Sequence, residues 1–310
     1  MKKNHKAFFS AALAVLMLAV CFAFPAGAAD AMTVKEIAGT GAQPFTFIVS
    51  GDAQLGASGD LAADKAGWQS SLSNAMAAWS EAKFLISVGD QINKNENAEQ
   101  LEAFVDAAAQ SGLPFAPTTG NHDPDILENF DLPNLDKFNN YWYTYGGVLF
   151  MHLDTNYTFG SITNRMIFMI KAACANPDAD WTVVSFHHAI YTASKRAKDS
   201  DVLFRRLLLV PLFELLDVDL VFTGHDHIYT RSKPMKLFMQ NDKGITYYTA
   251  NSGSGSKYYD VENENLKFVA AAGQPRAPSM IRVEVSADAL KMTTCRTDTM
   301  QQLDAFIIQK

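Results

Sequence analysis

In FTFIVSGD, residues 45–52, an apolar and strand-like run ends at a glycine and is followed at once by Asp52. An apolar run followed by Asp, Asn or His recurs in FLISVGD (84–90), FAPTTGNHD (115–123), WTVVSFHH (181–188) and VDLVFTGHDH (218–227). The carboxyl ends of parallel strands meet along one edge of a sheet, where open α/β sheets bind their ligands. The five stretches therefore predict parallel strands with a binding site at their carboxyl ends.

Helical patterns lie between these strands. Residues 64–82 carry Trp68, Leu72, Met76 and Trp79 at the spacing of one helix face. Similar patterns predict helices over residues 98–110, 163–175 and 201–216. The alternation of strand and helix indicates parallel strands joined by right-handed crossovers.

The C-terminal part of the chain changes character. Residues 141–154 predict a bend and then a strand. Residues 245–250, 280–285, 290–295 and 305–308 read as antiparallel strands separated by turns. We expect the tail strands to complete a second sheet. The fold class is then α/β, with four layers in the order helix, sheet, sheet and helix, an αββα sandwich.

Residues 1–28 are typical of a secretory signal peptide, with a basic start, an apolar run over 7–24 and an Ala-x-Ala exit that ends at Ala28. We therefore expect an exported protein, periplasmic or extracellular. Two weaker alternatives are a lipoprotein attached at Cys21, where Val20 is too bulky, and a membrane anchor. Against an anchor, the apolar run is near the lower length limit for a spanning helix and ends at Pro25.

The net charge of the chain is −7, and cleavage would remove three lysines and no acid, which gives −10. An acidic surface argues against a nucleic-acid partner, because that affinity comes mainly from Lys and Arg. After a lead-in over residues 29–44, residues 45–310 show no linker or repeat, so we expect a single domain. Cys174 and Cys295 lie outside any metal motif, and we expect two buried free thiols, with a disulfide left open.

The polar residues that follow the strands are of the kinds that bind metal ions. Asp52 and Asp90 offer carboxylates and Asn121 offers a neutral oxygen. The Gly-His-Asp-His sequence at residues 224–227 places two imidazoles on one face of an extended segment. Mixed carboxylate and imidazole ligands suit zinc, iron or manganese. We therefore expect ligands for two metal ions.

The distribution of histidines supports this interpretation. Five of the six histidines that would remain after cleavage lie in the strand-end stretches. His122 could bind metal or transfer protons. His152 is the exception, because it lies inside an apolar strand and is expected to be a hydrogen-bonded core residue. His188 is a weaker ligand candidate than His187, since neighbours on an extended chain point to opposite faces.

Taken in order, the motifs GD, GD, GNHD, a strand-end His and GHDH resemble the calcineurin-like metallophosphoesterase superfamily. GHDHIYTR and the spacing from His187 to Tyr191 are most similar to its purple acid phosphatase branch. The resemblance covers about residues 45–310. It implies the αββα fold and hydrolysis of phosphate monoesters by a metal-bound hydroxide, with a small phosphorylated substrate.

The resemblance also implies a ligand set in which Asp90 bridges two metal ions. The residues that would complete the set are Asp52 and His227 for one ion, and Asn121, His187 and His225 for the other. The ions would be divalent or mixed-valence Fe, Mn or Zn, with Mg less favoured. His122 would protonate the leaving oxygen or hold the phosphate, with Asp123 as its partner.

Two positions depart from the family pattern. The usual Asp-x-His is Asp52-Ala-Gln54 here, and the usual Asp-x-x-Tyr is Asp90-Gln-Ile-Asn93. The first ion therefore lacks one strong ligand. A carbonyl oxygen of Gln54 or Asn93 could replace it, which favours a harder or more weakly held ion.

Three other functions stay open or are disfavoured by the sequence. A phosphodiesterase could use the same ligands. A metal-binding or interaction protein that has lost turnover is favoured only by the altered first site. A metallo-β-lactamase-like hydrolase would need an early His-x-His-x-Asp cluster, which is absent.

Residues 251–257, NSGSGSK, lack the end of a phosphate-binding P-loop, and we expect a flexible surface loop there.

Overall fold

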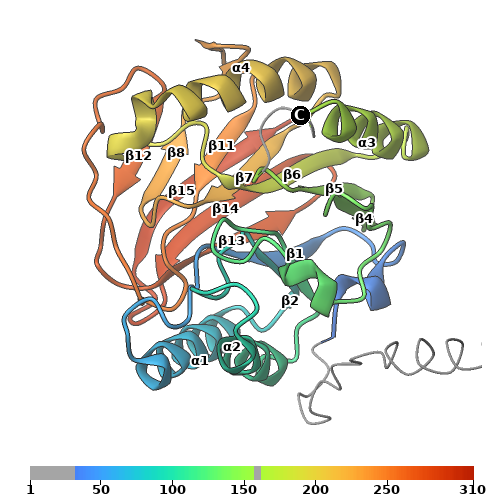
Figure 1. Ribbon diagram of the computed structural model, residues 1–310. Helices are drawn as coiled ribbons and strands as arrows, with labels where there is room; N and C mark the ends of the chain where they lie inside the picture. Colours follow the sequence, from blue (N-terminus) through green and yellow to red (C-terminus); the bar gives the residue numbers. More distant parts are fainter. Residues whose placement is uncertain (1–31, 157–161) are drawn as a thin grey trace, which may run out of the picture.

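The computed structural model describes residues 32–156 and 162–310. The predicted signal peptide, Cys21 and the first residues of the lead-in lie outside them. Two large sheets pack face to face, with helices α1 and α2 on one side and α3 and α4 on the other (Figure 1). The predicted αββα sandwich is therefore confirmed. Among the described residues, no helix is both long and apolar enough to cross a membrane.

The first sheet holds the strands that lead to Asp52, Asp90 and Asn121. Its order is β15-β14-β13-β1-β2-β3, with β1, β2 and β3 parallel and β13 antiparallel to β1. The bounds are β1 Phe45–Ser50, β2 Ala82–Ser87, β3 Phe115–Pro117, β13 Ser279–Val285, β14 Ala289–Arg296 and β15 Gln302–Gln309. The last three strands run antiparallel to their neighbours, as predicted.

The second sheet holds the strands that lead to the histidines. Its order is β12-β8-β11-β7-β6-β5-β4, with β5, β6, β7 and β11 parallel. The bounds are β4 Tyr141–Tyr145, β5 Val148–Leu153, β6 Trp181–His188, β7 Leu220–Gly224, β8 Tyr229–Ser232, β11 Thr246–Thr249 and β12 Val269–Gly273. A short hairpin, β9 Met235–Lys236 and β10 Met239–Gln240, forms a small sheet of its own, and Met235 bridges to Ile245 just before β11.

The helices lie close to their predicted positions. They are α1 Leu61–Ala78, α2 Ala98–Gln110, α3 Ile162–Ala175 and α4 Ser200–Leu215, with short 3-10 helices η1 Val34–Ile37, η2 Ile126–Asn129 and η3 Lys195–Lys198. Side-chain caps fix two of the starts. Asp60 accepts a hydrogen bond from the amide of Ala63, and Asn97 accepts one from Gln100. Such caps stabilise a helix by about 1 kcal/mol.

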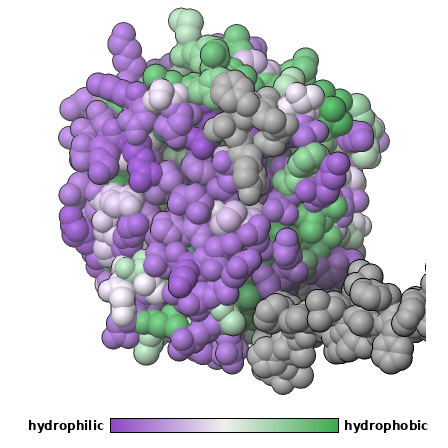
Figure 2. All heavy atoms as spheres, in the orientation of Figure 1, coloured by the Kyte–Doolittle hydropathy of each residue, from purple (hydrophilic) through white to green (hydrophobic). Residues whose placement is uncertain are grey.

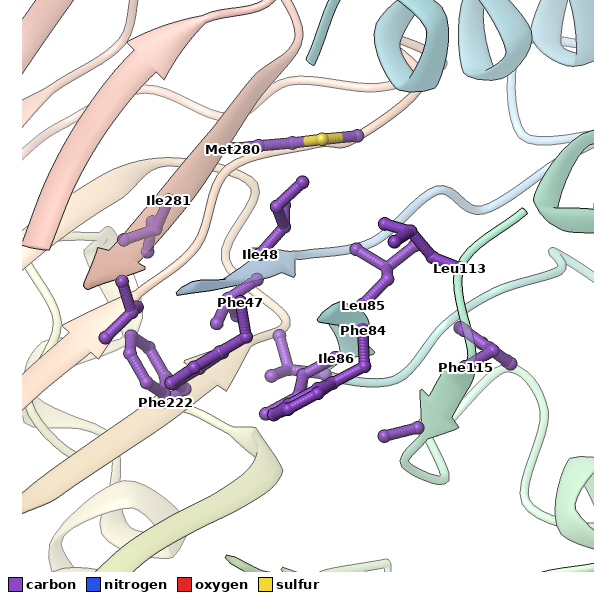
Figure 3. Packing of buried hydrophobic residues seen from close by; sticks show 14 of the residues in the cluster. Phe47, Ile48, Phe84, Leu85, Ile86, Leu113, Phe115, Phe222, Met280 and Ile281 are labelled. Atoms are coloured by element: carbon purple, nitrogen blue, oxygen red, sulfur yellow. The ribbon is translucent and has the colours of Figure 1, made fainter. Parts of the chain in front are cut away.

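Aromatic residues fill the space between the two sheets (Figure 3). Phe47 of β1 stacks on Phe84 of β2 with ring centroids 5.2 Å apart, and Phe150 of β5 meets both rings edge-on at 5.3 Å. Phe222 of β7 lies 6.3 Å from Phe47. All four side chains are fully buried. This packing fixes the spacing of the sheets and hence the distance between the strand ends.

The second sheet is apolar on both faces. Phe150 faces the first sheet, whereas Leu149 and Met151 on either side of it pack with the helix layer. There, Phe186 of β6 lies 5.9 Å from Phe213 of α4. Strands buried on both faces read as continuous apolar runs. Figure 2 shows a mostly hydrophilic face, with hydrophobic residues gathered over the outer helices α3 and α4.

Several sequence expectations need correction. The five motifs do not share one sheet edge, because three belong to the first sheet and two to the second. The tail strands β13 to β15 extend the first sheet, and the segment before β5 is a strand rather than a bend. β11 is antiparallel to β8, as predicted, but parallel to β7. Both cysteines are free, but Cys174 is exposed and only Cys295 is buried.

Candidate metal centre

Polar residues that follow strands of both sheets lie together at one end of the sandwich. Asp52 follows β1 and Asp90 follows β2, while His187 lies near the end of β6 and His225 directly follows β7. The two facing sheets have parallel segments that end at the same end of the sandwich. Asp52 accepts the backbone N–H of His225 with both carboxylate oxygens, at 2.9 and 3.0 Å. This contact joins the strand ends of the two sheets directly.

One group of ligand atoms surrounds the Nε2 atom of His187. Asn121 Oδ1 lies 3.1 Å from it, and Asp90 Oδ2 and His225 Nδ1 each lie 3.2 Å from it. Atoms that bind one zinc ion at 2.0–2.2 Å are separated by about 3–3.5 Å. The four residues therefore have the donor types and spacing of a metal site.

A second group consists of Asp52, Asp90 and His227, whose ligand atoms all lie within 4.8 Å of one another. His227 Nε2 is 3.5 Å from Asp52 Oδ1. Asp90 also belongs to the group of His187 and His225. One carboxylate thus faces two neighbouring ligand groups, and all three side chains of the second group are buried.

Hydrogen bonds to carbonyl groups orient two of the three imidazoles. The Nδ1 atom of His187 lies 2.9 Å from the oxygen of Val88, and Nδ1 of His227 lies 3.1 Å from that of Lys257. An Nδ1–H that donates to a carbonyl leaves the Nε2 lone pair free for a metal ion, as in most histidine ligands. His225 differs, because its Nδ1 faces the cluster and its Nε2 contacts Arg196.

The backbone at the strand ends adopts unusual conformations. Asp90, His225 and His227 have φ values of 49°, 72° and 46°, in the left-handed region. Each such residue costs about 1–2 kcal/mol. Glycines allow the close approach of neighbouring segments, since a Cβ atom at Gly120 would lie 2.1 Å from Asp90 Oδ1 and one at Gly224 would lie 2.6 Å from Asp52 Oδ2. These backbone conformations lower the local stability, and they allow the carboxylates of Asp52 and Asp90 to lie close to the neighbouring strand ends.

Gln54 stands where the family pattern has a histidine. Its Nε2 atom donates to Asn93 Oδ1 at 3.0 Å, so the amide oxygen of Asn93 is already used. The Oε1 atom of Gln54 is fully buried and has no hydrogen-bond partner in the part of the chain that the structure describes. A buried and unpaired oxygen on a residue two positions from Asp52 is suited to a cation, and of the two candidates Gln54 is the one whose amide oxygen is free.

His122 and Asp123 occupy different environments. The backbone N–H of His122 donates to Asp90 Oδ1 at 2.8 Å, and its Nδ1 lies 2.8 Å from the carbonyl oxygen of Asn93. Asp123 is fully buried and accepts four backbone N–H groups, those of Asp90, Gln91, Ile92 and Gly120. The predicted partnership of Asp123 with the His122 ring is therefore corrected. Asn93 holds the ring, and Asp123 holds the loop that carries Asp90.

The charges of Asp52, Asp90 and His187 shift one another's pKa values. Burial raises the pKa of Asp52 to about 8, against the attraction of His187. Burial would raise the pKa of Asp90 as well, but attraction and hydrogen bonding by His187 lower it to about 2. Burial would lower the pKa of His187, yet Asp90 and Asp52 raise it to about 9. Without metal, a proton on His187 offsets the carboxylate charge that a cation would otherwise balance.

Of the remaining histidines, His152 and His188 lie outside the ligand groups and His227 is a ligand candidate. His152 is buried, contacts the hydroxyl of Thr118 at 3.1 Å and stacks on Tyr141, which confirms a core role. His188 contacts the hydroxyl of Thr155 at 2.8 Å and lies outside both ligand groups. Burial lowers the pKa of His227 to about 3, so this imidazole is neutral and available as a ligand.

Some contributors carried no signal in the sequence. The loop at residues 251–257 is not a surface loop over its first half, because Ser252 and Ser254 are buried and donate to the carbonyl groups of Asp52 and Ala53. The Lys257 carbonyl and the ring of Tyr259, 5.2 Å from His227, come from irregular backbone. Arg196, which contacts His225, is different, because it follows the predicted strand-end stretch 181–188 in the sequence.

Comparisons with known proteins identify the family of this chain. The family model for calcineurin-like phosphoesterases matches residues 42–229. Purple acid phosphatase 4 of Arabidopsis thaliana is 26% identical over 166 residues, which are 49% of this chain and 46% of that protein. The chain spans less than half of the length of the curated relatives that it matches, between 30% and 46%.

Two solved structures share the fold. The purple acid phosphatase PPD1 of yellow lupin superposes with a TM-score of 0.73 at 15% identity, over 86% of this chain and 54% of that one. GAP50, the anchor in the inner membrane complex of Plasmodium, superposes with a TM-score of 0.62 at 15% identity, over 86% and 88%. The family model covers more than half of the sequence, and the chain belongs to the calcineurin-like phosphoesterase family.

Proposed function

We propose that this chain is a binuclear metal-dependent phosphoesterase that hydrolyses phosphate monoesters of small substrates. The observation that carries the proposal is the pair of ligand groups that share Asp90. Two such ions, of Fe, Mn or Zn, would activate the attacking water and stabilise charge on the phosphate oxygens. The ligands for one ion are Asp90, Asn121, His187 and His225, and those for the other are Asp52, Gln54, Asp90 and His227.

His122 is the proposed general acid. Its backbone N–H bonds to Asp90, and its Nδ1 faces the carbonyl oxygen of Asn93, so the ring has a fixed orientation beside the ligand groups. With the proton of Nδ1 held by that carbonyl, Nε2 is the atom that gives a proton to the leaving oxygen. Asp123 positions this arrangement through the backbone of residues 90–92.

The decisive experiment removes metal with a chelator and restores Mn, Zn, Fe or Mg singly. Hydrolysis of an aryl phosphate monoester is then compared with that of the matching diester. We expect turnover with at least one transition metal and a higher kcat/KM for the monoester. A preference for the diester would identify a phosphodiesterase instead. Absence of turnover with every metal would favour a metal-binding protein that keeps the fold without catalysis.

The role of His122 is tested by the leaving group. We expect His122→Asn to lower kcat about 10²- to 10⁴-fold for an alkyl phosphate, whose leaving oxygen needs a proton. The loss should be much smaller for a nitrophenyl phosphate, which leaves without protonation. Metal content should stay at the wild-type level. An equal loss for both substrates would exclude a general-acid role.

Export is a further part of the proposal. It is supported by the pattern of residues 1–28, which lie outside the described residues. Mass spectrometry of the protein recovered from cells should give an N-terminus at Ala29. An intact N-terminus at Met1 would contradict cleavage, and a lipid on Cys21 would support the lipoprotein alternative.

A further inference from the structure

Arg196 places a guanidinium group against the proposed metal centre. It lies on η3, directly after the loop that follows β6, and its Nη1 atom contacts Nε2 of His225. The loop is firmly held, because the hydroxyl of Ser194 donates to Asp226 at 2.9 Å and accepts the backbone N–H of Arg196 at 3.1 Å. Arg196 is therefore a positioned cation rather than a solvated surface residue.

Arg196 makes no salt bridge within the described part of the chain. Among residues 32–156 and 162–310, no carboxylate oxygen lies within 4.0 Å of the Arg196 guanidinium. The ring of Tyr259 is its other neighbour, with the guanidinium carbon 5.8 Å from the ring centroid. A partly buried guanidinium that lacks a carboxylate and faces the cluster is suited to an anion, above all to a phosphate, which matches its planar fork.

The contact with His225 is incompatible with a metal ion bound through Nδ1 of that ring. It needs Nε2 as the acceptor, which puts the ring proton on Nδ1, the atom that faces the cluster and would have to bind the metal ion. A neutral imidazole that binds metal through Nδ1 carries its proton on Nε2. Two N–H groups would then face each other, so Arg196 would have to turn to another acceptor. For His187 and His227, by contrast, a carbonyl already takes the outer N–H.

We propose that Arg196 is the substrate-binding residue that metal binding releases from His225, and that it then binds a nonbridging oxygen of the phosphate group. This inference rests on the proposed function, since it assigns a residue for recognising the ester. It adds a cation from the chain itself to the two metal ions. It also links metal loading to phosphate affinity.

A cavity beside Arg196 indicates the size of the alcohol. It has a volume of about 140 Å³, and it is lined by Ser194, Lys195, Arg196, Asp226, Tyr258, Tyr259, Asp260 and Glu262. A dry cavity of about 150 Å³ holds a benzene molecule, so this one has room for about six non-hydrogen atoms. The polar walls favour a hydroxyl-bearing group. The substrate class is thus the phosphate monoester of a small polar alcohol, such as glycerol phosphate.

The first test measures binding of inorganic phosphate by calorimetry to the Mn-loaded full chain. Arg196→Gln should weaken binding about ten- to a hundredfold, the loss of one charge-assisted interaction. Arg196→Lys should recover part of it. Lys198→Gln, which removes a charge from the same short helix, should leave phosphate binding unchanged. Equal phosphate affinity in wild type and Arg196→Gln, with equal metal content, would overturn the inference.

The second test follows Arg196 itself. Phenylglyoxal modifies accessible arginines, and mass spectrometry can compare the peptide of Arg196 with that of Arg296, whose guanidinium pairs with Asp298. We expect Mn to accelerate modification of Arg196 and phosphate to suppress it, with Arg296 unaffected. A modification rate that is the same with and without Mn would refute release by metal.

Hydrolysis assays distinguish a failure of the Arg196 inference from a failure of the proposed phosphoesterase function. If no ester is hydrolysed but phosphate binding depends on Arg196, the proposed function fails and the inference stands. If the wild type hydrolyses monoesters and Arg196→Gln has the same KM, the inference fails and the function stands. Among substrates, kcat/KM should be higher for glycerol phosphate than for a nucleoside monophosphate. The reverse order would contradict the proposed alcohol class.

Discussion

The two ligand groups share Asp90 but differ in how completely they are built. Around His187 Nε2, a carboxylate, an amide and a second imidazole all lie within 3.2 Å. Around Asp52, one imidazole lies at 3.5 Å, and the next candidate is the amide oxygen of Gln54. Both groups arise from the same type of strand end. The comparison shows that one metal position can keep its ligands while its neighbour changes character.

The difference follows from ligand chemistry. Imidazole nitrogen binds zinc, iron and copper strongly, whereas an amide oxygen is a weak and hard ligand. The Gln54 amide is nevertheless fixed in place, because its Nε2 donates to Asn93. We therefore expect one tight ion near His187 and one exchangeable ion near Asp52, with Asp90 contributing to both.

Loss of the shared carboxylate should have the largest effect. Asp90→Asn removes a charged ligand from both positions, so we expect neither ion to stay bound through gel filtration and turnover to fall to background. Elemental analysis and the hydrolysis assay check both outcomes. Full activity in this variant would exclude a bridging role for Asp90.

Changing one imidazole should affect one position only. His187→Ala should abolish the tight ion, because His187 Nε2 lies at the centre of that group. His227→Ala should leave the tight ion in place and remove the exchangeable one. Metal titrations of the two variants measure this directly. The same metal content in both would show that the positions are not separable.

Restoring the missing ligand should reduce the difference between the two positions. Gln54→His supplies an imidazole beside Asp52, and we expect affinity for zinc at the weak position to rise about tenfold or more, which is about 1.4 kcal/mol. Gln54→Leu should weaken it by a similar factor. Asn93→Leu tests the other candidate and should have a smaller effect, because the Asn93 oxygen is already bonded and orients Gln54 instead of binding metal. A larger effect from Asn93 than from Gln54 would reverse the ligand assignment.

The pH dependence of metal affinity should differ slightly between the two metal positions. At neutral pH and without metal, His187 with a pKa of about 9 and Asp52 with a pKa of about 8 both hold a proton that a cation must displace. Affinity at each position should therefore rise about tenfold per pH unit below that pKa and level off above it. Calorimetry in buffers of different ionisation enthalpy detects the released protons. Affinities that do not change between pH 6 and pH 9 would contradict these pKa shifts.

The sequence was sufficient to predict the elements and the layers. Apolar runs such as FLISVGD predict strands because both faces of the sheets are buried, and the helix at residues 98–110 was predicted with the bounds that α2 has. It could not show which sheet each strand joins. The tail strand Met280 to Val285 pairs with β1, a choice that depends on long-range packing rather than on local pattern.

The candidate ligands of the site could also be predicted from the sequence, whereas the backbone groups that orient them could not. Asp52, Asp90, Asn121 and the histidines were singled out because an apolar run followed by Asp, Asn or His recurs five times. The partner of His122 was wrong, since Asn93 supplies a carbonyl group that every residue possesses. Backbone carbonyls and irregular segments such as that of Tyr259 leave no trace in residue types.

Equilibrium dialysis of the metal-free protein against a range of Mn²⁺ concentrations measures how many ions bind and in how many steps. We expect two equivalents of Mn²⁺ that bind in two steps with midpoints at least about tenfold apart, and Gln54→Leu should weaken only the second step. A single step with two equal equivalents, or binding of only one ion at saturation, would contradict the claim that one complete and one altered metal position share Asp90.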